Sequence, residues 1–237
     1  MKFGVIRLPG SNCDQDCYHI AASVYGIDTD YLWHKDRQQL EEYDLVMIPG
    51  GFSYGDYLRT GAIARFSPLM KSVRDYARAG GLVMGICNGF QILTEMGLLP
   101  GALMVNDSLQ FKCQYVYLRV EERETPYTTL CSKGQILEMP IAHGDGSYYL
   151  PLDQLEKLEA EGQVILRYCD QEGKINDEAN PNGAVNNIAG ICNQERNVFG
   201  LMPHPERSGE TILGNGSVDG KMIFDSILES RGVKSSG

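Results

Sequence analysis

Positive charge is scarce in this chain, and long apolar runs are absent. Asp and Glu number 31 against 21 Lys and Arg, which leaves a formal net charge of −10 at neutral pH. An acidic chain is repelled by nucleic-acid phosphates and by anionic lipids, so its composition argues against both as partners. No apolar run approaches the roughly 20 residues of a membrane-spanning helix. Lys2 leads directly into an apolar segment without a signal-peptide pattern, so we expect a cytoplasmic protein.

Cysteines at the spacing of a metal site are also missing. The seven cysteines are an odd number and lie scattered along the chain. Cys13 and Cys17 are one helical turn apart, but no further cluster of Cys or His completes a zinc site. Seven thiols without a disulfide framework suit a reducing cytosol. We therefore expect no bound metal in this protein.

Nothing in the sequence divides the chain into separate domains. Its 237 residues can bury one large core, and no Pro/Ser-rich linker or internal repeat interrupts them. In the first half, apolar strand-like runs alternate with helical stretches; the runs are 3–8, 45–48 and 82–86, and the helices 58–79 and 90–96. This alternation predicts an open, mostly parallel sheet with helices on both faces.

The second half has a different pattern. Residues 114–121 alternate between apolar and polar side chains, and several short strands are expected from there to Leu201. A helix over 220–230 closes the chain. We expect one α/β domain over 1–237, with its functional loops at the carboxyl edge of the sheet.

The most informative segment is the junction at Cys87. An apolar run at 82–86 ends at this cysteine, a helical stretch follows, and Gly85 and Gly89 stand two positions away on either side. This is the Gly-x-nucleophile-x-Gly pattern of a nucleophile elbow, with Cys in place of Ser. A sharp strand-to-helix turn strains the corner residue and leaves no room for side chains two positions away. The N-terminus of the following helix also favours the thiolate form of Cys87. The alternative interpretation is that Cys87 is a buried structural cysteine.

Only four histidines are available as a base for this thiol. His19 lies in a helical stretch, His34 has no evident partner, and His143 lies in a glycine-rich loop. His204 stands between two prolines that stiffen its backbone, and Glu206 follows two residues later. A carboxylate at that spacing can hold the imidazole in one tautomer, as the orienting member of a triad does. In the alternative interpretation, Glu206 is merely solvated.

A third element is the buried strand at 44–48, which ends in Gly50 and Gly51. Backbone N–H groups in such a loop can form half of an oxyanion hole. The other half is usually the N–H of the residue after the nucleophile, here Asn88. A turn without chemistry explains the two glycines equally well.

Three motifs together resemble those of a known family. They are Pro-Gly-Gly-Phe-Ser-Tyr-Gly-Asp at 49–56, Gly-Ile-Cys-Asn-Gly-Phe-Gln at 85–91 and Pro-His-Pro-Glu-Arg at 203–207. They resemble the class I, triad-type glutamine amidotransferases, which have a flavodoxin-like fold. The opening Pro-Gly-Ser-Asn-Cys at 9–13 and the Phe-Ser-Tyr-Gly-Asp segment at 52–56 are similar to the PurQ branch, and this resemblance runs nearly end to end. PurQ proteins are glutaminase subunits of phosphoribosylformylglycinamidine synthases.

The resemblance implies a role for each motif. Cys87 would be the nucleophile, His204 the general base and acid, and Glu206 the residue that orients it. The oxyanion hole would be formed by Gly51, Phe52 and Asn88. The side chain or backbone of four further residues would contact the substrate glutamine, namely Gly50, Gln91, His143 and Gly144.

The resemblance also implies partners. Ammonia released from glutamine would pass to a PurL-type synthetase subunit for the ATP-dependent conversion of formylglycinamide ribonucleotide to the amidine, and a small PurS-type subunit would join the assembly. ATP and Mg would belong to the synthetase, because this chain needs no cofactor for glutamine hydrolysis. Its segment at 214–222 has the wrong glycine spacing for a phosphate loop, and Met222 follows Lys221 where Ser or Thr is required. Since Met1 directly precedes the first strand, we expect a free-standing glutaminase.

Two positions depart from the family pattern. Gly144-Asp145-Gly146-Ser147 stands where Gly-Glu-Gly-Arg is expected, and Arg196 replaces a glycine in a hairpin turn. Two other classes of function also remain open. A cysteine hydrolase of related fold could act on another γ-glutamyl or peptide substrate, although Glu206 argues against most of these. A non-catalytic binding subunit would not need the Cys, His and Glu set.

Overall fold

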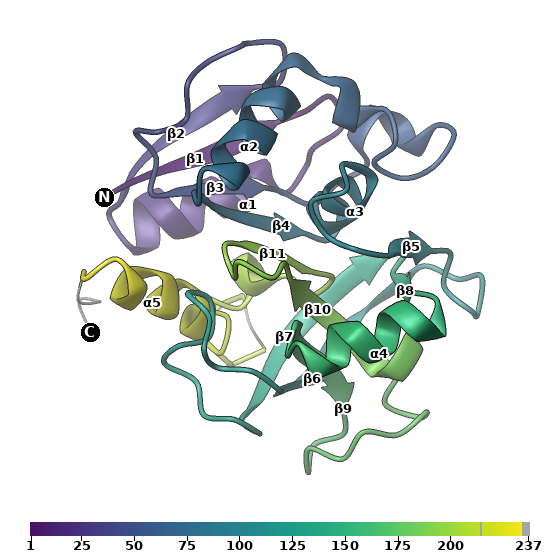
Figure 1. The fold of residues 1–237 in the computed structure, drawn as a ribbon. Helices are drawn as coiled ribbons and strands as arrows, with labels where there is room; N and C mark the ends of the chain where they lie inside the picture. The colour runs from purple at the N-terminus through teal and green to yellow at the C-terminus, as the bar shows by residue number, and fades with distance from the viewer. Residues whose placement is uncertain (214, 234–237) are drawn as a thin grey trace.

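The computed structural model describes residues 1–213 and 215–233. Gly214 and residues 234–237 lie outside this part, so the segment 214–222 and the expected domain 1–237 are each described only in part. The single-domain expectation stays a prediction. One large sheet runs through both halves of the described chain (Figure 1).

The central part of this sheet is parallel. Its strands pair in the order β2-β1-β3-β4-β11, and every neighbouring pair among them is parallel. Their bounds are β1 (Lys2–Arg7), β2 (Asp28–Trp33), β3 (Leu45–Ile48), β4 (Leu82–Ile86) and β11 (Val198–Leu201). All residues of β3, β4 and β11 are buried. Burial on both faces is what the continuous apolar runs predict for a parallel sheet covered by helices.

The strand order reverses between β1 and β3, and this reversal positions the helices. From β1 the chain crosses to β2 through α1 (Asp14–Tyr18) and a π-helical turn at His19–Val24. From β3 it crosses the other way to β4 through α2 (Pro68–Arg78). Because such crossovers are right-handed, opposite directions place α1 and α2 on opposite faces of the sheet (Figure 1). Open α/β sheets form their binding crevices at the carboxyl ends of strands beside such a reversal.

The second half of the chain extends the sheet with antiparallel strands. Beyond β11 the order continues β10-β9-β6-β7, and each of these strands is antiparallel to its neighbours. Their bounds are β6 (Lys112–Val120), β7 (Ile136–His143), β9 (Val164–Cys169) and β10 (Ile188–Cys192), and β5 (Ala102–Met104) pairs separately with β8 (Ser147–Tyr149). The expected fold class is therefore confirmed: a parallel α/β sheet that further strands from the second half extend.

The described chain contains three more α-helices. Two match the sequence pattern closely, α3 (Asn88–Glu95) and α5 (Lys221–Ser230). The third, α4 (Leu152–Ala160), was not expected from the sequence. Leu155 and Leu158 are its only buried residues, and this narrow apolar stripe is too short to stand out among the strands around it. Among the described residues, no helix combines the length and apolar character that crossing a bilayer requires.

The long helix expected over 58–79 is wrong in its first part. Only a short 3-10 turn at Ala64–Phe66 precedes α2, which begins at Pro68. Leu58 and Gly61 have φ values of 72° and 78°, which a right-handed helix excludes. A side chain at Gly61 would also lie 3.0 Å from the backbone nitrogen of Ile92. The segment before α2 is therefore a loop packed on α3 rather than a helix.

Tyr127 reinforces the pairing of β4 with β11 from outside the sheet. Its ring is fully buried, and its hydroxyl lies 2.9 Å from the carbonyl oxygen of Val83 and 2.6 Å from that of Asn197. Val83 lies in β4 and Asn197 directly precedes β11; these two strands carry the site described below, so a loop of the second half supports the centre of the sheet.

The substitution Tyr127→Phe is expected to lower the free energy of unfolding by about 1–3 kcal/mol, because buried carbonyls lose a donor while the ring stays in place. Urea denaturation followed by circular dichroism measures this difference. Tyr57→Phe is the matched control, since Tyr57 is 74% exposed and its hydroxyl is solvated. Equal stability of the Tyr127 variant and the unmodified chain would contradict the expectation.

Candidate active site

Cys87 occupies the corner between β4 and α3, as the elbow pattern predicts. Its backbone has φ 51° and ψ −105°, a conformation that a residue with a side chain adopts only under strain. A Cβ at Gly85 would lie 2.6 Å from the carbonyl oxygen of Gly89, and one at Gly89 would lie 2.0 Å from that of Ile48. The two glycines are therefore required by close backbone approaches. Cys87 is only 5% exposed, and its Sγ lies 3.7 Å from the carbonyl oxygen of Ala142.

His204 and Glu206 follow β11, the parallel neighbour of β4. Leu201 pairs with Ile86, so the chain leaves both strands at the same edge of the sheet. The Nδ1 atom of His204 lies 2.6 Å from Oε1 of Glu206, and both residues are 1% exposed. The backbone N–H of His204 donates to the carbonyl oxygen of Pro140 at 2.9 Å. The imidazole is thus fixed by its own backbone and by a buried carboxylate.

This arrangement defines the electrostatics of the histidine. Burial by itself would lower the pKa of His204, but the Glu206 carboxylate and the thiols of Cys13 and Cys87 outweigh it and raise the pKa well above its usual value. With Glu206 on Nδ1, the proton at that nitrogen is held and Nε2 faces away from the carboxylate. Nε2 is buried without a hydrogen-bond partner among the described residues, so it is available to exchange a proton with a neighbouring group.

Gly50 lies where Cys87 and His204 meet. A Cβ at this position would be 2.8 Å from Cε1 of His204 and 3.4 Å from Cβ of Cys87. The absence of a side chain at Gly50 thus leaves room for the Cys87–His204 pair. The substrate contact expected from Gly50 stays a prediction.

The expected oxyanion hole is only partly open in this conformation. The N–H of Phe52 donates to the carbonyl oxygen of Gly10 at 3.0 Å, and Gly51 has φ 139°. The N–H of Asn88 belongs to the first turn of α3, next to Cys87. Phe52 would have to release Gly10 before its N–H could stabilise an oxyanion. The assignment of Gly51, Phe52 and Asn88 to the oxyanion hole stays a prediction.

Gln91 connects two loops beside Cys87. Its Oε1 accepts a hydrogen bond from Nδ2 of Asn88 at 2.8 Å, and its Nε2 donates to the carbonyl oxygen of Asp145 at 2.5 Å. Asn88 in turn accepts a hydrogen bond from the N–H of Ser53 at 3.2 Å. Because the Gln91 amide is already engaged at both ends, it holds the two loops in place here, and its contact with glutamine stays a prediction.

His143 lies at the end of β7 and is held away from solvent. Its Nδ1 lies 3.1 Å from Oδ1 of Asn106, and its Nε2 lies 3.5 Å from Nδ2 of Asn182. Burial, followed by repulsion from His204, lowers the pKa of His143 to about 4, so this imidazole is neutral at physiological pH. The carbonyl oxygen of Gly144 accepts the N–H of Asn106 at 2.8 Å. Contacts of His143 and Gly144 with glutamine stay predictions.

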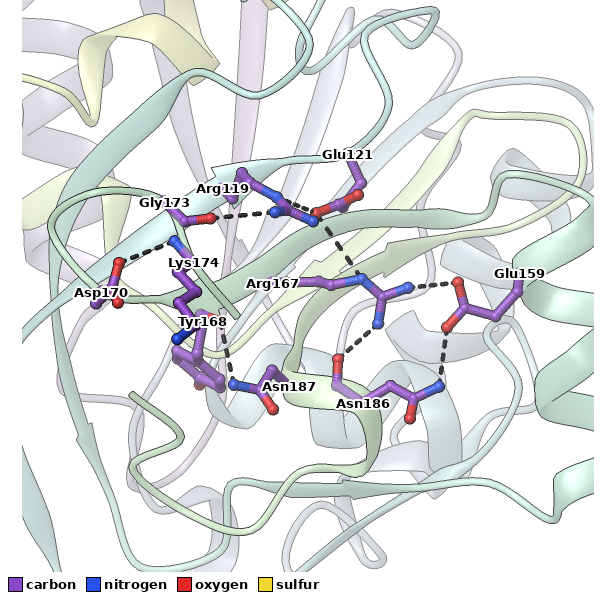
Figure 2. Close-up of polar contacts among 10 residues, drawn as sticks. All are labelled: Arg119, Glu121, Glu159, Arg167, Tyr168, Asp170, Gly173, Lys174, Asn186 and Asn187. Carbon is purple, nitrogen blue, oxygen red and sulfur yellow. Dashed lines mark hydrogen bonds and ion pairs between the residues drawn. The ribbon is translucent and has the colours of Figure 1, made fainter. Parts of the chain in front are cut away.

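Sequence reasoning missed the support behind His143, which is the segment carrying Asn182. Figure 2 shows the polar contacts that hold this segment against the sheet. Arg167 of β9 forms an ion pair with Glu159 of α4 and donates to the carbonyl oxygen of Asn186 at 2.5 Å. Asn186 in turn donates from Nδ2 to Glu159 at 3.2 Å. Long-range contacts of this kind leave no local sequence signal.

Cys13 is a second thiol in the site that the sequence did not assign. Its Sγ, a ring nitrogen of His204 and a carboxylate oxygen of Glu206 lie within 4.8 Å of one another. Nη2 of Arg207 donates to the same sulfur at 3.0 Å. The Cys13 sulfur, the His204 nitrogen and the Glu206 oxygen could together serve as metal ligands. The positive charge of the adjacent Arg207 guanidinium disfavours a bound cation there. The expectation that the protein binds no metal stays a prediction.

Arg196, the departure in the hairpin turn, has φ 62°. Its guanidinium donates to the carbonyl oxygens of Gly162 and Glu161, the latter at 3.0 Å. These hydrogen bonds offset the modest strain that a side chain brings to a turn suited to glycine.

Comparison with known proteins identifies the family. The model of the CobB/CobQ-like glutamine amidotransferase domain matches residues 1–222. The PurQ subunit of phosphoribosylformylglycinamidine synthase from Moorella thermoacetica is 57% identical over 229 residues, which cover 97% of this chain and 96% of that protein. The PurQ subunit from Aquifex aeolicus is 51% identical, over 96% of this chain and 99% of that protein. This chain belongs to the PurQ family of glutamine amidotransferases.

Solved structures agree with this family assignment. A chain in the structure of PurLQS from Thermotoga maritima has a TM-score of 0.85 and 44% identity, and covers 97% of this chain and 98% of that chain. A glutamine amidotransferase from the same organism has a TM-score of 0.57 at 15% identity, which shows a shared fold alone. The fold class and the resemblance inferred from the PurQ-like motifs are confirmed.

The thiols of this PurQ-family chain are expected to differ sharply in reactivity. Burial raises the pKa of five thiols and keeps them protonated. The pKa rises to about 11 for Cys131 and Cys169, and it is also raised for Cys13, Cys17 and Cys192. A chloroketone analogue of glutamine should therefore label Cys87 with one adduct per chain, as peptide mass spectrometry can show. Iodoacetamide is the control and should also label the exposed Cys113. Labelling of Cys13 or Cys17 in preference to Cys87 would contradict this expectation.

Proposed function

We infer that this chain is the glutaminase subunit of a phosphoribosylformylglycinamidine synthase and acts in purine biosynthesis. It hydrolyses L-glutamine to glutamate and supplies the ammonia to a partner subunit. The support is the near full-length identity to PurQ subunits of that synthase. The observation that carries the chemistry is the elbow cysteine beside a buried His–Glu pair at the carboxyl edge of the sheet.

We propose that Cys87, His204 and Glu206 act as nucleophile, base and orienting residue. The Cys87 thiolate attacks the side-chain amide carbon of glutamine, and backbone N–H groups near Gly51 and Asn88 stabilise the oxyanion. Protonated His204 gives its proton to the leaving ammonia, and a thioester remains on Cys87. His204 then takes a proton from water, which attacks the thioester and releases glutamate. Glu206 keeps the imidazole oriented and favours its charged form throughout.

The partners follow from the same relatives. A structural neighbour of this chain is part of PurLQS, so a PurL-type synthetase subunit and a small PurS-type subunit complete the proposed assembly. We expect ATP and Mg to be used by the synthetase, because glutamine hydrolysis through a thioester requires neither. A cytoplasmic location suits the free thiols and the proposed pathway.

Cys87→Ser is expected to lower glutamine-dependent synthesis by roughly 10³-fold or more, because a covalent nucleophile is lost. Synthesis from added ammonia should persist, since the acceptor chemistry lies in the partner. The measurement compares both nitrogen sources in the reconstituted complex. Cys113→Ser is the matched control, because it makes the same change at an exposed thiol. Retained glutamine hydrolysis by Cys87→Ser would refute the proposed nucleophile.

The isolated chain is expected to hydrolyse glutamine slowly. Phe52 must release Gly10 before its N–H can face an oxyanion, and docking of the synthetase could shift this equilibrium. A 100-fold activation corresponds to about 2.7 kcal/mol of coupling. Glutamate production should be measured for the chain alone and with the synthetase, its nucleotide and its substrate. If the isolated chain already reaches the rate of the complex, this coupling is absent while the glutaminase assignment stands.

A further inference from the structure

Two thiols and the imidazole of His204 converge beside Gly50. A Cβ at Gly50 would lie 3.0 Å from Sγ of Cys13 and 3.4 Å from Cβ of Cys87. The same position lies 2.8 Å from Cε1 of His204. Three side chains from three segments therefore meet around one point that the glycine leaves free. The chemistry proposed for glutamine uses Cys87 and His204, and it leaves Cys13 without a task.

Cys13 is held at this point by its backbone and by its side chain. Its N–H donates to the carbonyl oxygen of Gly50 at 3.3 Å, which ties the loop between β1 and α1 to the loop after β3. Nη2 of Arg207 donates to the Cys13 sulfur at 3.0 Å, and Nε of Arg207 pairs with Asp16 at 2.9 Å. Cys13 is 3% exposed. Its sulfur is therefore fixed in the interior, next to the same point as Cys87.

The surroundings of the Cys13 sulfur suit a thiol that reacts second. Burial raises the pKa of the Cys13 thiol, so this thiol is protonated and does not compete with Cys87 for an electrophile. A thiol attacks as its thiolate, and a nearby cation or base promotes that form. The guanidinium of Arg207 contacts the Cys13 sulfur, and a ring nitrogen of His204 lies within 4.8 Å of it. Cys13 can therefore give up its proton once the sulfur of Cys87 has become electrophilic.

Cys17 is a poorer partner for Cys13, although it is nearer in sequence. The N–H of Cys17 donates to the carbonyl oxygen of Cys13 at 3.0 Å, so the two residues stand one helical turn apart. Side chains at that spacing have Cβ atoms about 5–6 Å apart, whereas a disulfide requires about 3.5–4.5 Å. Cys13 and Cys87 belong to different segments and border one point, so rotation of their side chains can bring the two sulfurs together.

We propose that Cys13 and Cys87 form a reversible disulfide when hydrogen peroxide oxidises the site, with Cys13 as the resolving thiol. The Cys87 thiolate attacks one peroxide oxygen, the O–O bond breaks, and the hydroxide that leaves takes up a proton to become water. The sulfur of Cys87 is thereby oxidised to a sulfenic acid while the peroxide is reduced. Cys13 then attacks this sulfur. An S–S bond forms, the S–O bond breaks, and the hydroxide leaves with the proton of Cys13 as a second water.

The disulfide removes the proposed nucleophile and shields it from further oxidation. A sulfenic acid that meets no second thiol proceeds to sulfinic and sulfonic acids, which reducing thiols do not reverse. A disulfide, by contrast, returns to two thiols by exchange with a dithiol. The consequence for glutamine hydrolysis rests on the proposed function, whereas the disulfide itself requires only the placement of the two cysteines.

The test treats the purified full chain with excess hydrogen peroxide and then blocks the remaining thiols with N-ethylmaleimide. Tandem mass spectrometry of a non-reducing digest should find Cys13 joined to Cys87, in chains that still run as monomers on a non-reducing gel. Labelling by the chloroketone analogue of glutamine should be lost and should return after dithiothreitol. The proposal is overturned if Cys87 is recovered as a free thiol or chiefly as a sulfinic or sulfonic acid. A bond between Cys13 and Cys17, or a link between chains, would overturn it as well.

Cys13→Ser separates the two steps, because it keeps Cys87 and lacks the resolving thiol. After oxidation, dithiothreitol should restore at least about 10-fold less chloroketone labelling than in the unmodified chain. Labelling of the variant before oxidation checks that its site is folded, and if it fails, the disulfide mapping in the unmodified chain decides alone. Cys113→Ser is the matched control, because it removes an exposed thiol and should recover as the unmodified chain does.

Full recovery of labelling in Cys13→Ser would overturn the proposal, since Cys87 would then need no second thiol. Failure of the proposed function gives a different result. In that case the disulfide between Cys13 and Cys87 still forms, but the reduced chain does not hydrolyse glutamine in the complex reconstituted with its partner subunits.

Discussion

The left-handed backbone at Cys87 is the constraint on which the site depends. It places the thiol at a helix N-terminus and turns β4 directly into α3. That turn requires a glycine on either side, and it brings α3 against the carbonyl oxygen of Ile48 in β3. The strain of one residue is thereby distributed over three packed elements. None of them could shift without displacing Cys87, because interiors at this density do not deform gradually.

A second constraint is electrostatic. His204 and Glu206 are both 1% exposed, and burying an ion pair costs more than its attraction returns unless further hydrogen bonds support it. The support comes from the backbone of His204 bonded to Pro140. The main effect of the pair is thus to favour the charged form of the imidazole, rather than to stabilise the fold. The neutral His143 nearby does not share this role, since it lacks a carboxylate partner and burial keeps it uncharged.

The sequence predicted features whose cause is local and missed those whose cause is distant. The elbow at Cys87 and the His204–Glu206 pair follow from spacings of two residues, which the backbone converts directly into geometry. Cys13 reaches the histidine only because β1 and β11 deliver their loops to the same edge of one sheet, and no local pattern records that. Asn182 behind His143 depends equally on long-range contacts. The helix expected before Pro68 failed for a related reason: packing on α3 imposed left-handed backbone on residues whose side chains suit a helix.

The pairing of β4 with β11 also bears on how the protein is made. Ile86 and Leu201 are partners in the sheet although more than a hundred residues of chain separate them, and contacts of such long range form late and slowly. A nascent chain can complete the strands that carry the thiol well before the strand that carries the histidine leaves the ribosome. Until then Cys87 lacks the histidine that stands beside it in the folded structure. The Cys87–His204 pair is therefore a late marker of folding, since its two halves come from strands paired over a long range.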